Sequence, residues 1–225
     1  MSNPKFLNID SLSLQQALDE DAELIPLMTP EDEEEINKEE VPDVLLILPI
    51  RNTVLFPGVV IPITAGRDKS IKLIKDANRG NKTIGVVAQK DENIENPKAS
   101  DLYPIGTVAR ILKVLKMPDG NTMVVIQGKK RFELGEIIQE EPYIKAKVKE
   151  FKEVKPPAKD TEFKAIIDSV KELALKIIKE NPNLPSEASF AIKNIQSNNF
   201  LVNFISSNMN LGVAEKQDLL KISDL

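Results

Sequence analysis

The stretch from residue 44 to residue 63, VLLILPIRNTVLFPGVVIPI, constrains the fold more than any other part of the chain. It consists mostly of Val, Leu, Ile and Phe and carries a single charge, on Arg51. Its three prolines exclude a helix, because each one lacks a backbone donor and clashes with the preceding turn. Both alternating sets of side chains in 44–48 are apolar, which is typical of a strand covered on both faces. We predict extended segments at 44–48, 54–56 and 59–63, with turns between them.

Several kinds of chemistry are excluded by residue types that the chain lacks. There is no Cys and no His among the 225 residues, so disulfides, thiol nucleophiles, Ser-His-Asp catalysis and most transition-metal sites are absent. Gly128-Lys129-Lys130 lacks the upstream glycine and the Ser or Thr of a phosphate-binding P-loop. We therefore expect no catalytic residues, no metal site and no cofactor site in this chain.

Charge divides the chain at residue 43. Residues 1–43 carry thirteen acidic side chains and two Lys, a net charge of −11, whereas the remainder has a net charge of +6. Such a run of like charges with one aromatic residue, Phe6, predicts a disordered acidic leader over 1–43. This leader either acts as a solvating tail, or it serves as a docking peptide or as an acidic mask for the basic remainder of the chain. The sequence shows neither a signal peptide nor an apolar run long enough to span a membrane, so we expect a cytoplasmic protein.

Residues 44–154 read as a β-rich unit. A helix is predicted over 67–79, where apolar residues share one face and Asp68 lies in the first turn. Met117-Pro118-Asp119-Gly120-Asn121 predicts a hairpin turn, and Gly128–Arg131 a second tight reversal. The remaining predicted strands are 83–88, 105–115, 122–127, 132–138 and 143–151, with an exposed loop at 89–100.

After a Pro-Pro linker at 155–159, the apolar period changes from 2 to 3.6. Residues 163–178 predict an amphipathic helix, and three shorter helices follow, the last over 213–222. The fold class is therefore α+β: a β-rich open barrel followed by a small α-helical bundle over 160–225.

An ordered set of motifs resembles the amino-terminal domain of Lon, the ATP-dependent protease. The resemblance extends over about residues 44–225 and rests on these matches: Leu48-Pro49-Ile50-Arg51-Asn52, Val54, Phe56-Pro57, Pro62-Ile63, Gly66-Arg67-Asp68-Lys69-Ser70-Ile71, Val87-Ala88-Gln89-Lys90, Asp101-Leu102, Gly106-Thr107-Val108-Ala109, Lys116-Met117-Pro118-Asp119-Gly120, Gly128, Arg131, Glu215-Lys216-Gln217, Leu220 and Ser223-Asp224.

The resemblance implies a PUA-like β unit and a non-catalytic domain that recognises and delivers unfolded or damaged proteins and aids oligomer organisation. It further implies that the chain continues into an ATPase and a serine protease that assemble as a hexamer, with ATP and Mg²⁺ confined to those parts. A hexamer would present several weak polypeptide sites together, which raises the overall affinity.

The candidate polypeptide site consists of Leu55 and Phe56, beside the Pro57-Gly58 turn, and Arg67, Asp68 and Lys69 at the start of the predicted helix. A turn lies at the surface as a rule, so we expect an apolar patch bracketed by both charge signs. Only the resemblance favours this role over ordinary helix-start electrostatics.

The alternative is a stand-alone ligand- or RNA-binding module with the same β fold. Lys129-Lys130-Arg131 and the alternating Lys145, Lys147 and Lys149 could bind nucleic acid, with Tyr143 and Phe151 on the same strand face as those three lysines. The modest net charge weighs against this reading.

Overall fold

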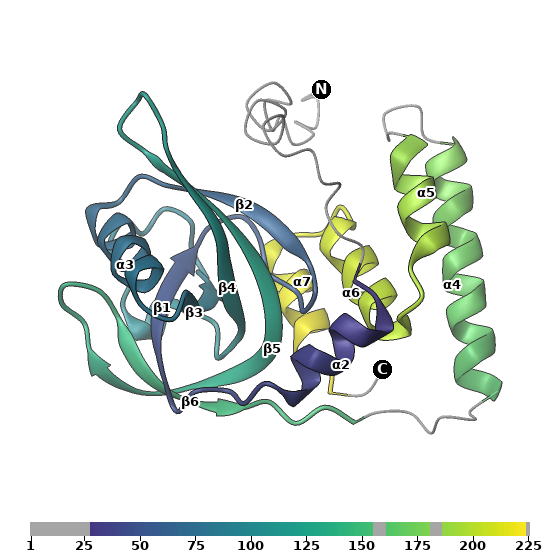
Figure 1. Ribbon diagram of the computed structural model, residues 1–225, viewed down its shortest axis with the longest axis horizontal. Helices are drawn as coiled ribbons and strands as arrows, with labels where there is room; N and C mark the ends of the chain where they lie inside the picture. Colours follow the sequence, from purple (N-terminus) through teal and green to yellow (C-terminus); the bar gives the residue numbers. More distant parts are fainter. Residues whose placement is uncertain (1–27, 155–160, 181–185, 224–225) are drawn as a thin grey trace.

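The computed structural model describes residues 28–154, 161–180 and 186–223 (Figure 1). Its elements are α2 (Pro30–Lys38), β1 (Val44–Ile50), β2 (Val60–Ala65), α3 (Asp68–Arg79), β3 (Thr83–Ala88), the short 3-10 helix η1 (Ala99–Asp101), β4 (Ile105–Lys116), β5 (Thr122–Gln139), β6 (Lys145–Glu150), α4 (Thr161–Glu180), α5 (Ser186–Asn194), α6 (Asn198–Asn208) and α7 (Val213–Leu220). The predicted α+β class is confirmed.

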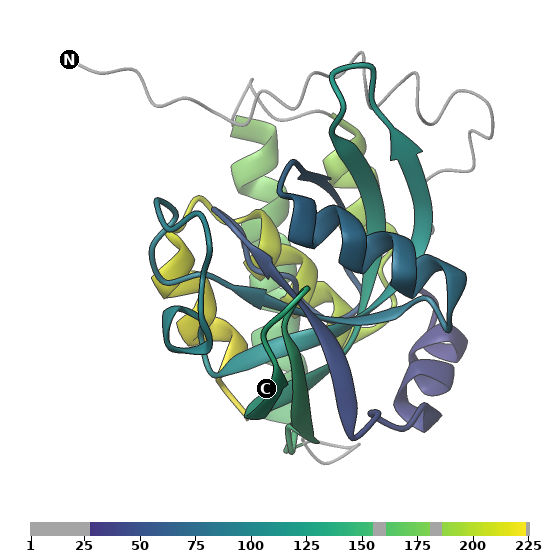
Figure 2. The ribbon, with the colours of Figure 1, turned by 90° about the vertical axis from the view of Figure 1, so that its left-hand side faces the viewer.

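The six strands form one sheet in the order β2-β5-β4-β3-β1-β6, and a further β5–β6 pairing closes five of them into a ring. β1 and β3 are parallel, and all other pairs are antiparallel. In Figure 1 the sheet lies between α3 and the helices α6 and α7; Figure 2 shows α3 lying across the strands. The ring is therefore more closed than the predicted open barrel.

β1 is buried on both faces, as its sequence predicts. Leu45 and Ile47 belong to a cluster to which each strand of the ring contributes, and Phe132 is its largest side chain. Leu48 and Ile50 belong to the larger cluster, which also includes residues of α3, α6 and α7. One apolar strand thus supplies two cores.

The predicted reversal at Gly128–Arg131 is wrong, because β5 continues through it as one strand of 18 residues. Gly128 is needed for close approach: a Cβ there would lie 2.3 Å from the carbonyl oxygen of Phe56. The backbone N–H of Gly128 donates to Val59 O, and the N–H of Gly58 donates to Gly128 O, both at 2.9 Å. Residues 54–56, predicted as a strand, are an irregular segment held against the sheet.

The predicted disorder is wrong for residues 28–43, whereas residues 1–27 lie outside the described part of the chain. α2 begins with a capping box, in which Asp32 N donates to Thr29 Oγ1 and Thr29 N donates to the Asp32 carboxylate. The bonds that Thr29 N and Thr29 Oγ1 donate to this carboxylate lower the pKa of Asp32. Met28 and Ile36 are buried in the larger cluster. The acidic run folds because Glu31, Asp32 and Glu33 lie in the first turn of a helix, whose dipole favours them, and because two apolar residues dock.

Glu33 fixes α2 to the start of α6. Its carboxylate accepts hydrogen bonds from Ser197 Oγ and from Asn199 Nδ2, the latter at 2.6 Å. We expect Glu33→Gln to lower the free energy of unfolding by about 1 kcal/mol, since a charge-assisted bond is lost. Glu34→Gln is the control, because Glu34 is 75% exposed and its ion pair with Lys38 is long, at 3.9 Å. Equal stability of the two variants in urea unfolding would contradict this anchoring role.

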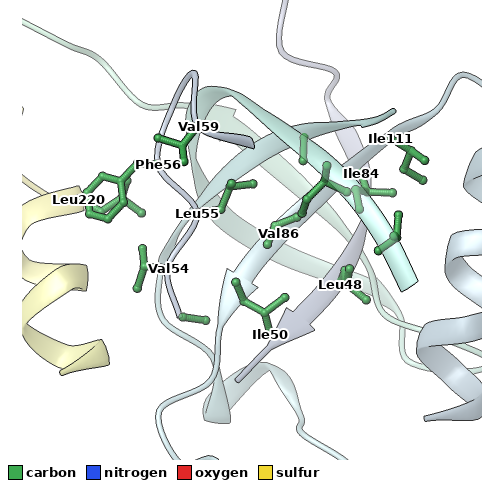
Figure 3. Close-up of a cluster of buried hydrophobic side chains, with 14 of the residues drawn as sticks. Leu48, Ile50, Val54, Leu55, Phe56, Val59, Ile84, Val86, Ile111 and Leu220 are labelled. Atoms are coloured by element: carbon green, nitrogen blue, oxygen red, sulfur yellow. The ribbon is translucent and has the colours of Figure 1, made fainter. Parts of the chain in front are cut away.

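The helices that follow the barrel also pack against it. Phe200, Leu201 and Leu220 belong to the same cluster as Val54 and Phe56, so α6 and α7 pack on the β unit. Figure 3 shows Leu220 beside Phe56. The predicted linker at 155–159 lies outside the described residues. Among the described helices, none combines the length and the apolar character that crossing a membrane requires.

Candidate functional site

The structure does not bring the five predicted site residues together at one surface. Leu55 and Phe56 are each 2% exposed, so the expectation of an exposed apolar patch beside the Pro57-Gly58 turn is wrong. The reason is tertiary: Leu55 and Phe56 belong to the larger core cluster, Leu220 of α7 lies beside Phe56, and Thr107 Oγ1 donates to Leu55 O at 2.6 Å. Asp68 and Lys69 are exposed at the start of α3, and Arg67 is half-buried.

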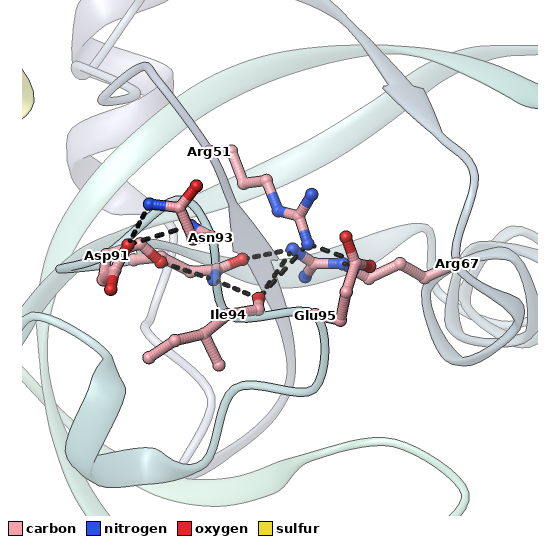
Figure 4. A network of polar contacts seen from close by, with 7 residues as sticks. Arg51, Arg67, Asp91, Asn93, Ile94 and Glu95 are labelled. Atoms are coloured by element: carbon pink, nitrogen blue, oxygen red, sulfur yellow. Dashed lines mark hydrogen bonds and ion pairs between the residues drawn. The ribbon is translucent and has the colours of Figure 1, made fainter.

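Arg67 belongs to a polar network with Arg51, which follows β1, and with the loop after β3 (Figure 4). Arg67 Nη2 donates to Gln89 Oε1 at 2.6 Å and lies 3.4 Å from Ile94 O. Arg51 Nη2 donates to the same carbonyl oxygen at 3.2 Å. Gln89 Nε2 also donates to Ile94 O, at 3.0 Å. The two arginines thereby hold the predicted exposed loop against the barrel.

Two positive charges share one carboxylate in this network. Glu95 Oε2 lies 3.1 Å from Arg51 Nη2 and 3.9 Å from Arg67 Nε, and the Glu95 side chain is 71% exposed. Burial first, and then the charge of Arg51, lowers the pKa of Arg67, while Glu95 opposes the shift. Arg51 Nε is buried and has no partner among the described atoms. Two neighbouring arginines such as Arg51 and Arg67 are suited to binding an anion.

A groove of about 240 Å³ lies beside the network. One part of its lining is apolar, from Ile47, Pro49, Leu73 and Ile144. The remaining lining residues are Arg67, Lys69, Ser70, Glu95, Asn96, Pro97, Lys98, Glu140, Glu141 and Tyr143. Lys69 Nζ donates to Glu141 Oε1 at 2.5 Å across the groove. Tyr143 donates to Asp76 at 3.0 Å, and burial together with this bond raises the pKa of Tyr143.

A second surface, on α4 and α5, is apolar and exposed. Ile166, Leu173 and Ile177 on α4 are 54%, 60% and 53% exposed, and Phe190 on α5 is 65% exposed. Spacings of seven and four residues place the three α4 side chains on one helix face. The sequence indicated an amphipathic α4 with Ile166, Leu173 and Ile177 among its apolar residues, but it did not single out Phe190 or an exposed apolar face. A signal was available, because the ten apolar residues of 163–178 cover a wider arc than one partner helix can bury.

The basic residues that favoured nucleic acid are largely neutralised. Lys147 pairs with Glu136 at 2.8 Å, and Lys130 with Glu150 at 2.9 Å. Arg131 pairs with Glu153 and lies over the Phe151 ring, 4.8 Å from its centroid. Within the ranges that the structure describes, no cluster of three or more acidic side chains is placed to hold a metal ion.

Residues 44–225 match the family model for the substrate-binding domain of the ATP-dependent protease La (LON). The chain belongs to this family. It is 67% identical over 225 residues to Lon protease of Flavobacterium johnsoniae and 52% identical over 205 residues to that of Cytophaga hutchinsonii. These alignments cover 100% and 91% of the chain but only 27% and 25% of the relatives. The chain thus spans about a quarter of their length.

The amino-terminal domain of a Lon protease from the Mycobacterium avium complex has the same fold. Its TM-score is 0.65 at 22% identity, with 80% of this chain and 91% of that chain covered. The corresponding domain from Xanthomonas campestris gives a TM-score of 0.52 at 17% identity, with the same coverage of both chains. The predicted resemblance to Lon amino-terminal domains is confirmed.

Proposed function

We propose that this Lon substrate-binding domain recognises unfolded or damaged polypeptide through the apolar face of α4 and α5 and delivers it to ATPase and protease parts of a longer protein. The observation that carries the proposal is the exposure of Ile166, Leu173, Ile177 and Phe190, each more than half accessible to solvent. Unfolded chains differ from folded ones in presenting apolar side chains, which such a face can cover.

The expected affinity of one such face is low. A partly exposed apolar side chain contributes roughly 1–2 kcal/mol when an apolar segment covers it, and ordering the flexible partner offsets part of that. Self-association would raise the overall affinity, because several faces would then engage one substrate. We therefore propose that the domain acts within a cytoplasmic oligomer, a hexamer in the full-length protein.

Catalysis belongs, in this proposal, to other parts of the protein. The chain lacks His and Cys, which leaves Ser-His-Asp and thiol chemistry without their reacting groups. ATP and Mg²⁺ would bind only the ATPase part. Ion pairs on Lys130, Lys147 and Arg131 weigh against the alternative of an RNA-binding module, since these charges already have partners.

A double substitution on α4 tests the proposal. We expect Leu173→Gln with Ile177→Gln to weaken binding of a permanently unfolded, carboxymethylated protein about five- to tenfold, because two exposed apolar contacts are removed. Fluorescence anisotropy would give the dissociation constant, and unchanged circular dichroism would show that the variant folds.

Leu112→Gln is the matched control, because Leu112 is 46% exposed on β4 of the barrel. If this control weakens binding as much as the α4 variant does, or if the α4 variant binds as tightly as the unsubstituted chain, the proposed face is wrong. Tight RNA binding that falls steeply with salt, without polypeptide binding, would favour the RNA-binding alternative.

A further inference from the structure

Arg67 and Glu95 line the groove at the start of α3, and Arg51, which lies outside the lining, contacts Glu95. Arg51 and Arg67 carry two positive charges against the single carboxylate of Glu95. From this arrangement we propose that the groove binds the C-terminal carboxylate of a polypeptide, and that Glu95 is a tethered internal occupant which the incoming carboxylate displaces. The inference rests on the proposed function, and it assigns to the domain a second, terminus-specific subsite.

The hydrogen-bond geometry leaves room for an acceptor. Arg67 is held by its Nη2 bond to Gln89, while its Nε lies 3.9 Å from Glu95, beyond hydrogen-bond distance. Arg51 Nε is buried and out of a ligand's reach, so Arg51 would meet the incoming carboxylate through Nη2, which lies 3.1 Å from Glu95 Oε2. A guanidinium forms its strongest bonds when it meets a carboxylate with two donors, and Glu95 satisfies neither arginine in that way.

The Glu95 side chain can move away from the two arginines. Its side chain is 71% exposed, and it extends from the loop between β3 and β4, so it can rotate into water without uncovering apolar surface. When it leaves, two half-buried guanidinium groups remain without a counter-charge, which favours replacement by another carboxylate.

The groove has a size that suits the end of a polypeptide chain better than a complete small-molecule ligand. Its volume of about 240 Å³ is smaller than that of typical small-molecule pockets, which begin at about 300 Å³. Pro49 and Tyr143, both half-buried, line the groove and can contact one apolar side chain, whereas Ile47 and Leu73 are almost fully buried. A free C-terminus with an apolar last residue presents that combination.

The charge balance favours a carboxylate over a phosphate. Arg51, Arg67 and Glu95 together carry one net positive charge, which one carboxylate matches. Glu140 and Glu141 also line the groove, where Lys69 pairs with Glu141 and the charge of Lys98 offsets that of Glu140. A doubly charged phosphate would leave the site with a net negative charge, whereas a terminal carboxylate leaves it neutral.

Two labelled decapeptides test the proposal. Both are rich in Gly and Ser, end in Leu and carry an amino-terminal fluorophore, and they differ only in a free carboxylate or an amide at the C-terminus. With the 225-residue chain, we expect the acid to bind about tenfold more tightly than the amide, because charged hydrogen bonds form only to the acid.

Glu95→Gln should strengthen binding of the acid about three- to tenfold and leave the amide unchanged, because it removes the competing charge. Glu92→Gln is the matched control, since Glu92 is an exposed residue of the same loop. Arg67→Gln should abolish the preference for the acid. If Arg67→Gln fails to fold, the Glu95→Gln result still decides, because Glu95 is a surface residue.

Equal binding of acid and amide overturns the proposal, as does an acid preference that Glu95→Gln leaves unaltered. Inorganic phosphate that competes with the acid as strongly as unlabelled acid peptide does would also overturn it, because the site would then bind anions in general. Any of these results, together with intact binding of unfolded protein to α4, refutes this subsite alone and leaves the proposed function standing.

Discussion

Phe56→Ala is expected to lower the free energy of unfolding by about 3–5 kcal/mol. The Phe56 side chain is 2% exposed and belongs to the larger core cluster, beside Leu220 of α7. Removing the ring leaves a cavity where α7 meets the β unit, and the surrounding backbone cannot fully collapse into it. Such a loss is a large fraction of the 5–15 kcal/mol that holds a typical domain together. Urea unfolding followed by circular dichroism measures it.

Leu112→Ala is the control for this prediction, because Leu112 is 46% exposed and its truncation leaves no enclosed cavity. We expect a change of about 0.5 kcal/mol or less. If Phe56→Ala instead unfolds at the same urea concentration as the unsubstituted chain, Phe56 does not fill the core as described. Weaker polypeptide binding by Phe56→Ala would report a loss of fold rather than a lost contact.

Arg131→Met is expected to cost about 3 kcal/mol and to loosen the docking of α7. Arg131 Nη1 donates to Leu220 O at 2.8 Å and also to Ile222 O, and its Nε donates to Glu153 Oε1 at 2.9 Å. Its side chain is only 9% exposed. Methionine fills much of the same space but donates nothing, so two carbonyl groups and a half-buried carboxylate lose their partner.

Lys147→Met is the matched control, because the Lys147–Glu136 pair is 62% and 69% exposed and water screens it. We expect it to change stability by about 0.5 kcal/mol at most. Amide hydrogen exchange adds a local readout, since Arg131→Met should speed exchange in α7 more than in the barrel. Similar losses in both variants, or unaltered exchange in α7, would show that Arg131 does not hold the helix.

Local sequence patterns predicted much of the β unit correctly. The turn at residues 117–121 does join β4 and β5, with Gly120 at φ +88 as a tight turn requires, and the apolar run at 44–48 is buried on both faces. The sequence around Gly128 is ambiguous, because glycine serves both in a turn and in a close approach of two backbones. Only the position of Phe56 O, more than seventy residues away, distinguishes the two uses.

The candidate site could also be predicted only in part. The sequence placed Arg67, Asp68 and Lys69 correctly at the start of a surface helix, because helix signals are local. It could not show that Arg67 meets Arg51 and Glu95, since loop 89–100 brings them together across the barrel. It could not show either that Leu55 and Phe56 are buried, because their cluster includes residues from distant parts of the chain, Leu220 of α7 among them.

The sequence by itself determined the α+β class, the hairpin, the period change after residue 159 and the membership in the Lon family. Each depends on residue order over short spans or on an ordered set of motifs. The tertiary structure decided which apolar faces stay exposed, that α2 docks through Met28 and Ile36, and that Arg51 and Arg67 share one carboxylate. Burial and pairing are properties of neighbours in space, and here those neighbours come from distant parts of the chain.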